Sequence, residues 1–497
     1  MPLTNAKLTA MRVAPDVGLA AVGLLMAVLY YFVYGGRYSL FQQGPLGLQS
    51  LATMNQNSLD SALWYIGTFA LLFGLYWLGS RWVKKANSQL WLIVGGGAIL
   101  FNVVLLPMLP FDAADIYDYI VRGRMTAVYG LNPMHDLPSQ VRTDIAYPNS
   151  AWHDVTSAYG PLWETMAAGL ARISGDNLLT NVMIFKLFEV LGELLTALLI
   201  ALTLRQIAPD RALLAVFLYT WNPIVPFFAA GNGHNDFAMT MLIMGSLYCL
   251  TRRWFVASTI VAVLGALVKF IPALLLPFIV IVAWRELRGE ARIKAFLSML
   301  LLTIVAVVSF YAPYWTGFET LALDRRSHLF TGSAGTLLRQ LLEPIIGFDS
   351  SVTVVSLTAW IAFFLFALII VVRFWQNVRQ TATVEPLQPI RILVLLLLFY
   401  LLIVVSWFQP WYVVWVLPMA LILADTPLRR VTILFSYLVT WQSLIYNYVT
   451  VRYNGFAPLP WRDLIPVAVV IGGPWLYIGW LWLRQVKSKK PALEVVR

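Results

Sequence analysis

Long apolar stretches recur along this chain and set what it can fold into. Twelve runs are apolar and bounded by polar or charged residues. A membrane-spanning helix needs about 20 predominantly apolar residues, within a range of roughly 17–25. The runs lie at 17–34, 63–80, 90–108, 181–204, 211–229, 236–251, 295–315, 353–373, 391–408, 411–424, 430–448 and 464–483.

The composition also indicates that most of the protein surface faces lipid. Hydrophobic residues make up 60% of the 497 residues and charged residues only 12%, whereas soluble domains have about 45–50% and 25%. Too few polar side chains remain to cover a water-facing surface. The sequence therefore predicts an all-α, polytopic membrane helix bundle, with residues 1–497 as a single domain in contact with the lipid bilayer. Because Cys249 is the only cysteine, no internal disulfide is expected. It falls within a predicted span.

The stretch 254–284 is too long for one span and short for two. Arg252 and Arg253 precede it, and a cluster of basic residues at 285–294 follows it. Positive charge marks the cytoplasmic ends of spans. We therefore expect a helical hairpin, 254–268 and 271–284, with Lys269 at its outer turn, which brings the total to about fourteen spans.

Charge also predicts the orientation. With both termini in the cytoplasm, the inner segments hold 23 of the 35 Lys and Arg residues, in agreement with the positive-inside rule. The net charge of +11 is then a topology signal, and we expect no nucleic acid partner. The outer face of this multi-pass cell-membrane protein receives the polar loops 36–62, 109–180, 316–352 and 449–463.

The loop 109–180 is the largest of these. Asp112 to Tyr129 reads as a helix that ends at Gly130, and Pro161 to Ile173 reads as a second helix followed by Gly175. Both patterns are amphipathic and too short to span. We expect these two helices to lie on the outer membrane surface.

The first of these helices carries the densest group of chemically useful side chains. Asp112, Asp115, Tyr119 and Arg122 are spaced by three and four residues, so they share one helix face. A carboxylate there can accept a proton from a hydroxyl, and an arginine can hold an anion. The alternative interpretation is a solvated helix with local ion pairs.

Three other places carry polar residues next to spans. In the segment Gly231-Asn-Gly-His234-Asn235-Asp236, exposed amides at a helix N-terminus favour an anion, and His234 adds a donor; helix capping is the alternative. Lys269 is an ionisable residue at membrane depth, which indicates function unless its side chain reaches out to the interface. Gln409, Trp411 and Tyr412 open a later span, where they line either a pocket or an interfacial aromatic belt.

One further group lies inside the fourth span. Lys186, Glu189 and Glu193 share a helix face, and we interpret them as a structural ion pair within the bundle. The sequence contains no P-loop, dinucleotide fingerprint, nucleophile elbow or zinc pattern.

Taken together, the ordered strings resemble the GT-C glycosyltransferases of prokaryotic membranes, and most closely the polyprenol-phosphate-mannose-dependent mannosyltransferases. The strings are Asp115-Ile-Tyr-Asp-Tyr119 with Gly123, Gly130-Leu-Asn-Pro133, Tyr159-Gly-Pro-Leu-Trp163, Gly233-His-Asn-Asp236, Lys269 with Pro272 and Pro277, and Gln409-Pro-Trp-Tyr412 with Leu417-Pro418. No single string is specific, but the set occurs in the family's order over about 112–418.

The resemblance implies a GT-C fold with an outer active site in the loop 109–180. A sugar, expected to be mannose, would move from a polyprenyl-phosphate donor to an acceptor hydroxyl with inversion. Asp115 best matches the family's general base, and Asp112 is the alternative. Arg122, His234 and Lys269 are then the candidates for the donor phosphate. The remaining candidate substrate-binding residues are Tyr119, Tyr159, Asn235, Asp236, Gln409, Trp411 and Tyr412.

Several points stay open at this stage. No cofactor is required if basic side chains neutralise the phosphate, although Asp112 and Asp115 could hold a divalent metal. The acceptor could be a lipid, a glycan or a protein. The main alternative function is a lipid or solute transporter or flippase, which predicts inverted repeats and acidic residues inside spans.

Overall fold

The computed structural model describes residues 14–44, 59–83, 88–110, 113, 115–321, 328–381, 383–444 and 459–487. These residues are predominantly helical and form no β-sheet; two isolated β-bridges pair Ser39 with Met108 and Thr331 with Trp407. The all-α class expected from the apolar runs is therefore confirmed.

The helices come in the following order along the chain. In the first half they are α1 (Pro15–Tyr30), α2 (Leu40–Gln43), α4 (Leu59–Ser80), α5 (Ser88–Leu105), α6 (Asp115–Ala127), α7 (Pro161–Ser174), α8 (Leu178–Ile207), α9 (Ala212–Thr220), α10 (Ile224–Pro226), α11 (Asp236–Thr251), α12 (Phe255–Ala266) and α13 (Leu276–Glu286). In the second half they are α14 (Gly289–Tyr311), α15 (Ala334–Ile346), α16 (Phe348–Gln380), α17 (Leu387–Phe399), α18 (Leu417–Ile422), α19 (Pro427–Leu438), α20 (Thr440–Leu444), α22 (Leu459–Val470) and α23 (Gly472–Lys487).

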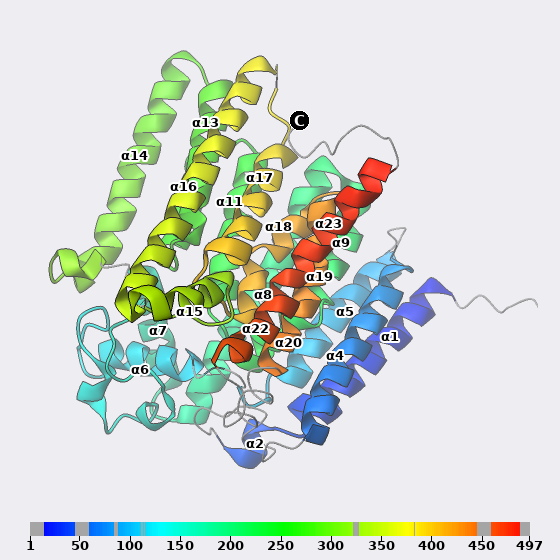
Figure 1. Ribbon diagram of the computed structural model, residues 1–497, viewed down its shortest axis with the longest axis vertical. Helices are drawn as coiled ribbons and strands as arrows, with labels where there is room; N and C mark the ends of the chain where they lie inside the picture. Colours follow the sequence, from blue (N-terminus) through cyan, green and yellow to red (C-terminus); the bar gives the residue numbers. More distant parts are fainter. Residues whose placement is uncertain are drawn as a thin grey trace, which may run out of the picture.

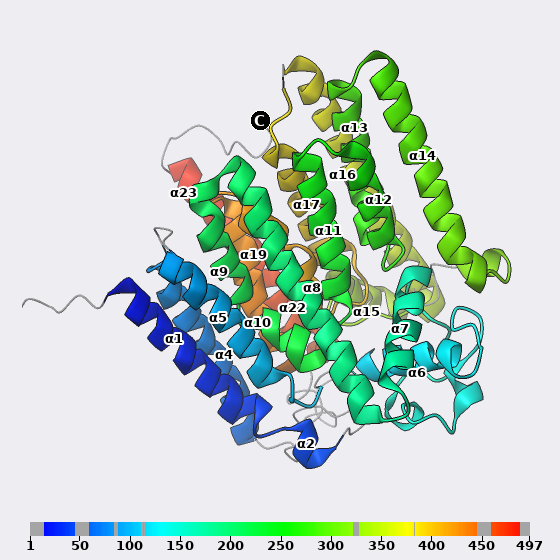
Figure 2. The ribbon, with the colours of Figure 1, turned by 180° about the vertical axis from the view of Figure 1, so that it is seen from behind.

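The long helices stand side by side in one bundle. Figures 1 and 2 show α1, α4 and α5 along one flank, α12, α13, α14 and α16 along the opposite flank, and α8, α9, α11 and α17 to α19 between them. The short helices α6 and α7 lie together at one end of the bundle (Figure 1). We call this end the α6–α7 end.

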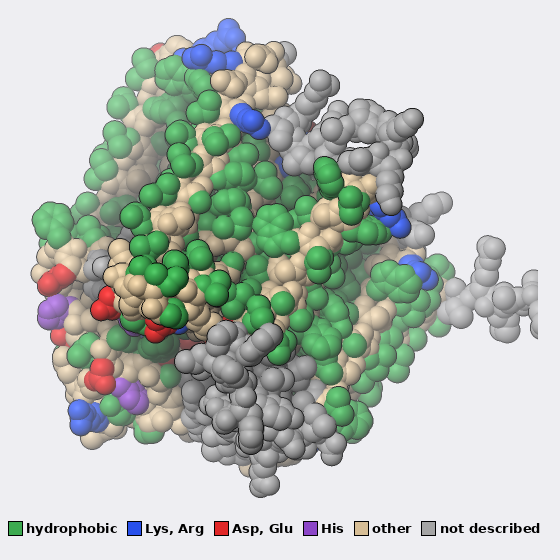
Figure 3. Space-filling view, viewed as in Figure 1, with side chains coloured by type: hydrophobic (Ala, Val, Ile, Leu, Met, Phe, Trp, Pro, Cys, Tyr) green, Lys and Arg blue, Asp and Glu red, His purple; other side chains and the backbone are tan. Residues whose placement is uncertain are grey.

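The surface of the bundle is apolar where protein does not cover it. In α14, a helix of 23 residues, only Met299 is buried, while side chains such as Leu300 and Leu301 are about 60% exposed. Figure 3 shows hydrophobic side chains over most of the long helices, with charged side chains mainly at the two ends. Long helices with apolar faces that no protein covers are typical of membrane spans, so the protein is integral to a membrane.

The described residues contain eight helices long and apolar enough to cross a membrane, or nine if the bent pair Pro209–Thr220 and Ile224–Asn232 is one span. Three shorter apolar helices, Asp236–Thr251, Phe255–Ala266 and Pro410–Ile422, add to the bundle. The total of fourteen spans therefore stays a prediction.

Residues 254–284 fold as two helices, α12 and α13, joined through Lys269 and the short 3₁₀ helix Ile271–Leu275. The two distant ends of this segment meet, because Arg253 Nη1 lies 2.5 Å from Glu286 Oε1. An ion pair at that place requires both helix ends to lie on the same side of the bundle, as the flanking positive charges predict.

Of the two helices of the loop 109–180, α6 does not lie on a surface as we expected, while α7 keeps exposed side chains such as Ile173 and its place at the membrane surface stays a prediction. α7 runs from Pro161 to Ser174, close to the predicted bounds, but α6 is buried at every position from Ile116 to Met125. It packs against α7 at Gly123, where a Cβ would lie 2.4 Å from the carbonyl oxygen of Ala167. The amphipathic pattern therefore marks a helix whose polar residues bond to neighbouring protein segments.

The predicted ion pair inside α8 is also corrected. Lys186 is fully buried and donates to the main-chain oxygens of Leu106 and Met108, just after α5. It is absent from the ion pairs of the described residues. An unsatisfied ammonium is costly in a protein interior, and main-chain carbonyls of the segment just after α5 supply its acceptors.

Candidate active site

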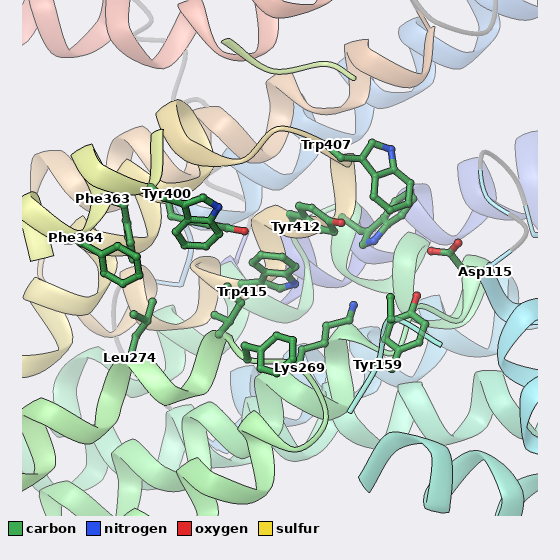
Figure 4. Close-up of a pocket in the computed structure, with 15 residues that line it drawn as sticks. Asp115, Tyr159, Lys269, Leu274, Phe363, Phe364, Tyr400, Trp407, Tyr412 and Trp415 are labelled. Atoms are coloured by element: carbon green, nitrogen blue, oxygen red, sulfur yellow. The ribbon is translucent and has the colours of Figure 1, made fainter. Parts of the chain in front are cut away.

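A cavity of about 420 Å³ opens between the start of α6, the segment before α7, the turn that joins α12 to α13, α16, and the stretch 400–415 that follows α17. Its wall consists of one acid, one base and mostly aromatic and aliphatic side chains: Asp115, Ala158, Tyr159, Lys269, Phe270, Ile271, Leu274, Trp360, Phe363, Phe364, Tyr400, Trp407, Trp411, Tyr412 and Trp415. Figure 4 shows that the cavity has two chemically different ends. Asp115 lies at one end, Leu274, Phe363 and Phe364 lie at the other, and Lys269 lies between them.

Asp115 begins α6 and its side chain is 13% exposed. The Nδ1 atom of His234 lies 3.8 Å from its Oδ2 atom, and the imidazole stacks on the indole of Trp411 with ring centroids 3.8 Å apart. Burial, and then the positive charge of Lys269, hold the pKa of His234 well below its usual value. His234 is therefore neutral at pH 7. Toward an anion it offers a hydrogen-bond donor but no positive charge.

A tight turn puts His234 beside Asp115. Gly233 ends the π-helical segment Phe227–Asn232 in the left-handed conformation, with φ of 69°. A Cβ there would also lie 2.7 Å from the Cδ1 atom of Ile116 in α6. Only glycine satisfies both conditions, which explains the Gly-His-Asn-Asp string.

Lys269 reaches the cavity from the turn between α12 and α13. Its Nζ atom lies 2.7 Å from Oδ1 of Asp236, a fully buried residue that opens α11 and also accepts from the indole of Trp415. The ammonium lies over the rings of Tyr159 and Trp415, at 5.2 and 5.9 Å. An ammonium has three donors, and Asp236 accepts one of them, so Lys269 keeps capacity to bind an anion.

The start of α7 is bound to this same turn. The main-chain N–H of Gly160 donates to the Val268 oxygen at 2.9 Å, and a Cβ on Gly160 would lie 2.1 Å from the Leu267 oxygen. The Tyr159-Gly-Pro string therefore lets the backbone of the loop approach the hairpin. As a result Tyr159 stands next to Lys269 in the cavity (Figure 4).

Tyr119, Tyr159 and Asn235 form a hydrogen-bonded chain behind the cavity wall. The phenol of Tyr119 donates to Oδ1 of Asn235 at 3.2 Å, and the phenol of Tyr159 lies 3.4 Å from that of Tyr119. These contacts join α6, the segment before α7 and the start of α11. Asn235 is therefore engaged with Tyr119 and does not cap α11 with its side chain.

Glu189 of α8 supplies that cap instead. Its Oε2 atom accepts from the main-chain N–H of Ala238 at 3.0 Å, and the side chain is buried. The next turn of α8 carries Gly192, where a Cβ would lie 3.0 Å from the Phe237 carbonyl carbon. The two helices thus pack closely, and a carboxylate satisfies an N–H group that a helix N-terminus leaves open. Glu189 fixes the helix end that carries Asp236.

Of the predicted site residues, Asp115, Tyr159, Lys269, Trp411 and Tyr412 line the cavity; His234, Tyr119, Asn235 and Asp236 lie behind the wall, in contact with these residues or with one another, and Arg122 and Gln409 lie elsewhere. Arg122 does not line the cavity: it is buried and donates to the main-chain oxygens of Trp152 and Val155 at 3.3 and 2.9 Å. It therefore does not share a cavity with Lys269, as a joint phosphate site requires. Gln409 is half-buried at the start of the 3₁₀ helix Pro410–Trp415 and is not part of the cavity wall. Asp112 lies outside the described residues.

Sequence reasoning missed the residues of the apolar end. Trp360, Phe363 and Phe364 belong to α16 and Tyr400 follows α17, where aromatic residues in an apolar run read as ordinary span residues. It also missed Trp407 and the capping role of Glu189. Among the described residues, no group of three or more His, Cys, Asp or Glu side chains could hold a metal ion.

Comparison with known proteins shows which family this chain resembles. A family model described as "Alpha-(1->6)-mannopyranosyltransferase, N-terminal domain" matches residues 17–285. Alpha-(1->6)-mannopyranosyltransferase A of Corynebacterium glutamicum is 23% identical over 269 residues, which is 52% of this chain and 54% of that protein. The protein of the same name from Mycobacterium tuberculosis is 26% identical over 313 residues, 60% of this chain and 58% of that protein.

A probable alpha-(1->6)-mannopyranosyltransferase of Mycolicibacterium smegmatis is 23% identical over 429 residues, covering 74% of this chain and 71% of the relative. The matched part of this chain spans a little over half the length of the first two relatives. The family model itself covers more than half of this chain. The resemblance to membrane mannosyltransferases that the ordered strings indicated is thus confirmed, and the chain belongs to the family of alpha-(1->6)-mannopyranosyltransferases that this model describes.

Proposed function

We propose that this protein is a membrane mannosyltransferase that moves mannose from a polyprenyl-phosphate donor to an acceptor hydroxyl, with inversion and with Asp115 as general base. One observation carries the proposal: a single cavity holds a carboxylate, an ammonium and an apolar aromatic end, in that order. A polyprenyl-phosphate sugar has the same order of parts, a sugar, a phosphate and a hydrocarbon chain.

The phosphate of the donor fits Lys269. The bond from the sugar C1 to the phosphate oxygen breaks, and the leaving polyprenyl phosphate gains negative charge. A cation already held in place stabilises that charge without reorganisation. The pair with Asp236 and the contacts with Tyr159 and Trp415 fix the ammonium. Because Lys269 supplies the positive charge, the proposed reaction requires no divalent metal, and a chelator should leave transfer unchanged.

The acceptor hydroxyl fits Asp115. The bond from the acceptor oxygen to C1 forms as the phosphate leaves, and the hydroxyl proton passes to the Asp115 carboxylate. General-base catalysis of this kind contributes roughly 10²–10⁴-fold. Inversion that forms an α linkage, as in the names of the relatives, requires a donor in which mannose is β-linked to phosphate.

The distribution of charge supports an active site on the outer face. Most Lys and Arg side chains visible in Figure 3 lie at the ends away from α6 and α7, while Asp, Glu and His side chains gather near these two helices. The positive-inside rule then assigns the α6–α7 end to the outer side. Labelling tests this assignment in a Cys249→Ser background. A membrane-impermeant thiol reagent should modify Asp176→Cys in intact cells, and Lys294→Cys only after permeabilisation.

The experiment that tests the function is transfer of labelled mannose from synthetic polyprenyl-phosphate-β-mannose to membrane extracts. We expect the purified full-length chain to form a labelled, α-linked product, and Asp115→Asn to form little. A lipid transporter or flippase would move the donor across proteoliposome membranes without forming a product. Translocation without transfer would therefore replace the proposed function.

A further inference from the structure

The cavity leaves one side for the second substrate. If the donor occupies the apolar end and Lys269, the acceptor must approach Asp115 from the opposite side. Trp407 lies on that side, nearer to Asp115 than to Phe363 and Phe364 (Figure 4). The exposed Ala158 and the half-buried Trp152 belong to the loop segment 150–158 that borders it.

Two tryptophans meet at this border. The ring of Trp152 contacts the ring of Trp407 edge to face, with centroids 5.6 Å apart and planes at 75°. Both side chains are half-buried, so each keeps part of its surface accessible. The pair joins two segments far apart in the sequence, the loop before α7 and the stretch that follows α17.

The backbone of Trp152 is clamped from α6. Its N–H donates to Oδ1 of Asp118 at 3.2 Å, and its carbonyl accepts from Arg122 at 3.3 Å. Asp118 and Arg122 are themselves almost completely buried, each under 3% exposed. Two buried charged groups thus fix the main chain on both sides of one tryptophan.

The rest of the segment is held as firmly. The N–H of Ser157 donates to the Pro133 oxygen at 2.8 Å, and the Ser157 hydroxyl donates to Glu164 of α7. The His153 ring stacks on Tyr147, with centroids 4.1 Å apart. The segment is therefore a preorganised wall, and such rigidity lowers the entropy cost of binding a ligand.

We propose that Trp152 and Trp407 form the acceptor subsite and that the acceptor group they bind is a saccharide; this rests on the proposed function. The C–H groups on one face of a pyranose ring pack against an indole, while its hydroxyls point outward to polar groups. Rigid aromatic side chains supply such contact area at low entropic cost. A sugar resting on Trp407 presents its hydroxyls toward Asp115. Asp118 and Arg122 are positioning residues that act through Trp152.

Saturation-transfer-difference NMR tests the subsite without catalysis. The probe is soluble α-(1→6)-linked mannotriose, added to the full-length chain in detergent micelles, with maltotriose as the comparison sugar. We expect a signal for mannotriose that exceeds that for maltotriose. Trp407→Ala and Trp152→Ala should each weaken mannotriose binding by roughly fivefold, the loss expected of one aromatic contact.

Matched variants separate the subsite from general damage. Trp64→Ala, at a residue 62% exposed on α4, should bind mannotriose as the wild type does. Trp360→Ala, at the apolar end, should keep the mannotriose signal while donor binding weakens. If an alanine variant fails to fold, Trp152→Phe and Trp407→Phe keep an aromatic face, and we expect them to retain most of the binding.

Each outcome is decisive. Absence of a mannotriose signal in the wild type, or unchanged binding in both folded tryptophan variants, overturns the subsite even if mannose is transferred. Binding that depends on both tryptophans upholds the subsite even if no transfer occurs, in which case the proposed function alone fails.

Discussion

Residues 17–285 and 286–497 contribute different chemistry to the same cavity. The first part, which the family model matches, supplies both charged groups, Asp115 and Lys269, together with Tyr159 and the aliphatic residues of the hairpin turn. The second part supplies only aromatic side chains, among them Trp360, Phe363, Tyr400 and Trp407. Neither part encloses the cavity alone. The comparison teaches that the charged groups of the cavity all come from the first part, and most of its aromatic surface from the second.

The two parts also differ in how their residues are held. Asp236, Lys269 and Asn235 are linked by hydrogen bonds to partners on other helices, so each position depends on several others. The aromatic residues of α16 are held by ring contacts, such as Phe363 with Tyr400 at 5.7 Å. We therefore expect large, all-or-none effects in the first part and graded effects in the second.

The largest expected effect is that of Asp115→Asn. The change keeps the shape of the side chain and removes its basicity, so turnover should fall by roughly 10²-fold or more while donor binding is retained. Asp176→Asn, a change of an exposed acid in the same region (84% exposed), should leave turnover unchanged. The measurement is single-turnover transfer from the labelled donor. Near-normal turnover in Asp115→Asn, with loss in Asp112→Asn instead, would move the role of base to Asp112.

The next effect concerns Lys269. Lys269→Ala removes the cation proposed to bind the phosphate, and donor affinity should fall by roughly 10–100-fold, the range for a hydrogen bond to a charged group. It also leaves Asp236 without its ionic partner, which destabilises a protein strongly when the pair is buried. The double variant Lys269→Ala/Asp236→Asn removes both charges.

This double variant separates the two effects of Lys269. It should regain thermal stability and still bind donor weakly, as measured by isothermal titration with a non-transferable donor analogue. Recovery of donor affinity together with stability would show that Lys269 serves only to neutralise Asp236.

The sequence predicted both charged residues of the cavity wall and the aromatic residues Tyr159, Trp411 and Tyr412, but none of the aromatic residues of α16, for a physical reason. A charged residue in an apolar chain is rare and costly, so Asp115, Asp236 and Lys269 stand out against their surroundings. Aromatic residues in a span are common and have many roles. Nothing in the pattern of α16 distinguishes Phe363, which lines the cavity, from any lipid-facing phenylalanine.

Arg122 shows the limit of that reasoning. Its spacing correctly placed it on the same helix face as Asp115 and Tyr119, but a shared face does not determine which neighbour a long side chain meets. The loop 150–158 covers that end of α6, and its carbonyls take the guanidinium. The capping role of Glu189, which the sequence placed in an ion pair, was missed for a related reason, because its partner Ala238 lies 49 positions further along the chain.

Glu189 allows a test of how far the first part depends on its hydrogen bonds. Glu189→Ala removes the acceptor for the Ala238 N–H group at the start of α11. Loss of a helix cap costs about 1 kcal/mol, and a displaced Asp236–Lys269 pair should lower turnover by roughly tenfold. Glu189→Gln keeps an acceptor oxygen and should restore most of the activity.

The matched control for this variant is one turn further along α8. Glu193 is equally buried, but lies near Asn102 of α5 instead of the start of α11. Glu193→Ala should change thermal stability more than turnover. Equal loss of turnover in Glu189→Gln and Glu189→Ala would contradict the capping role, because the glutamine oxygen still accepts.

The smallest expected effect belongs to the second part. Phe364 lines the cavity yet is 64% exposed on α16, so Phe364→Ala should fold normally. If the side chain contacts the hydrocarbon of the donor, its loss should raise KM by about threefold for a long polyprenyl donor, through the apolar contact area removed. A donor cut to a single isoprene unit should show no change, because its chain would not reach that end of the cavity.

Leu301→Ala, at a lipid-facing residue of α14 that is 61% exposed, is the control and should leave both KM values unchanged. A rise in KM that is independent of chain length would show that α16 acts on the sugar or the phosphate, and would remove the division of labour between the two parts of the chain.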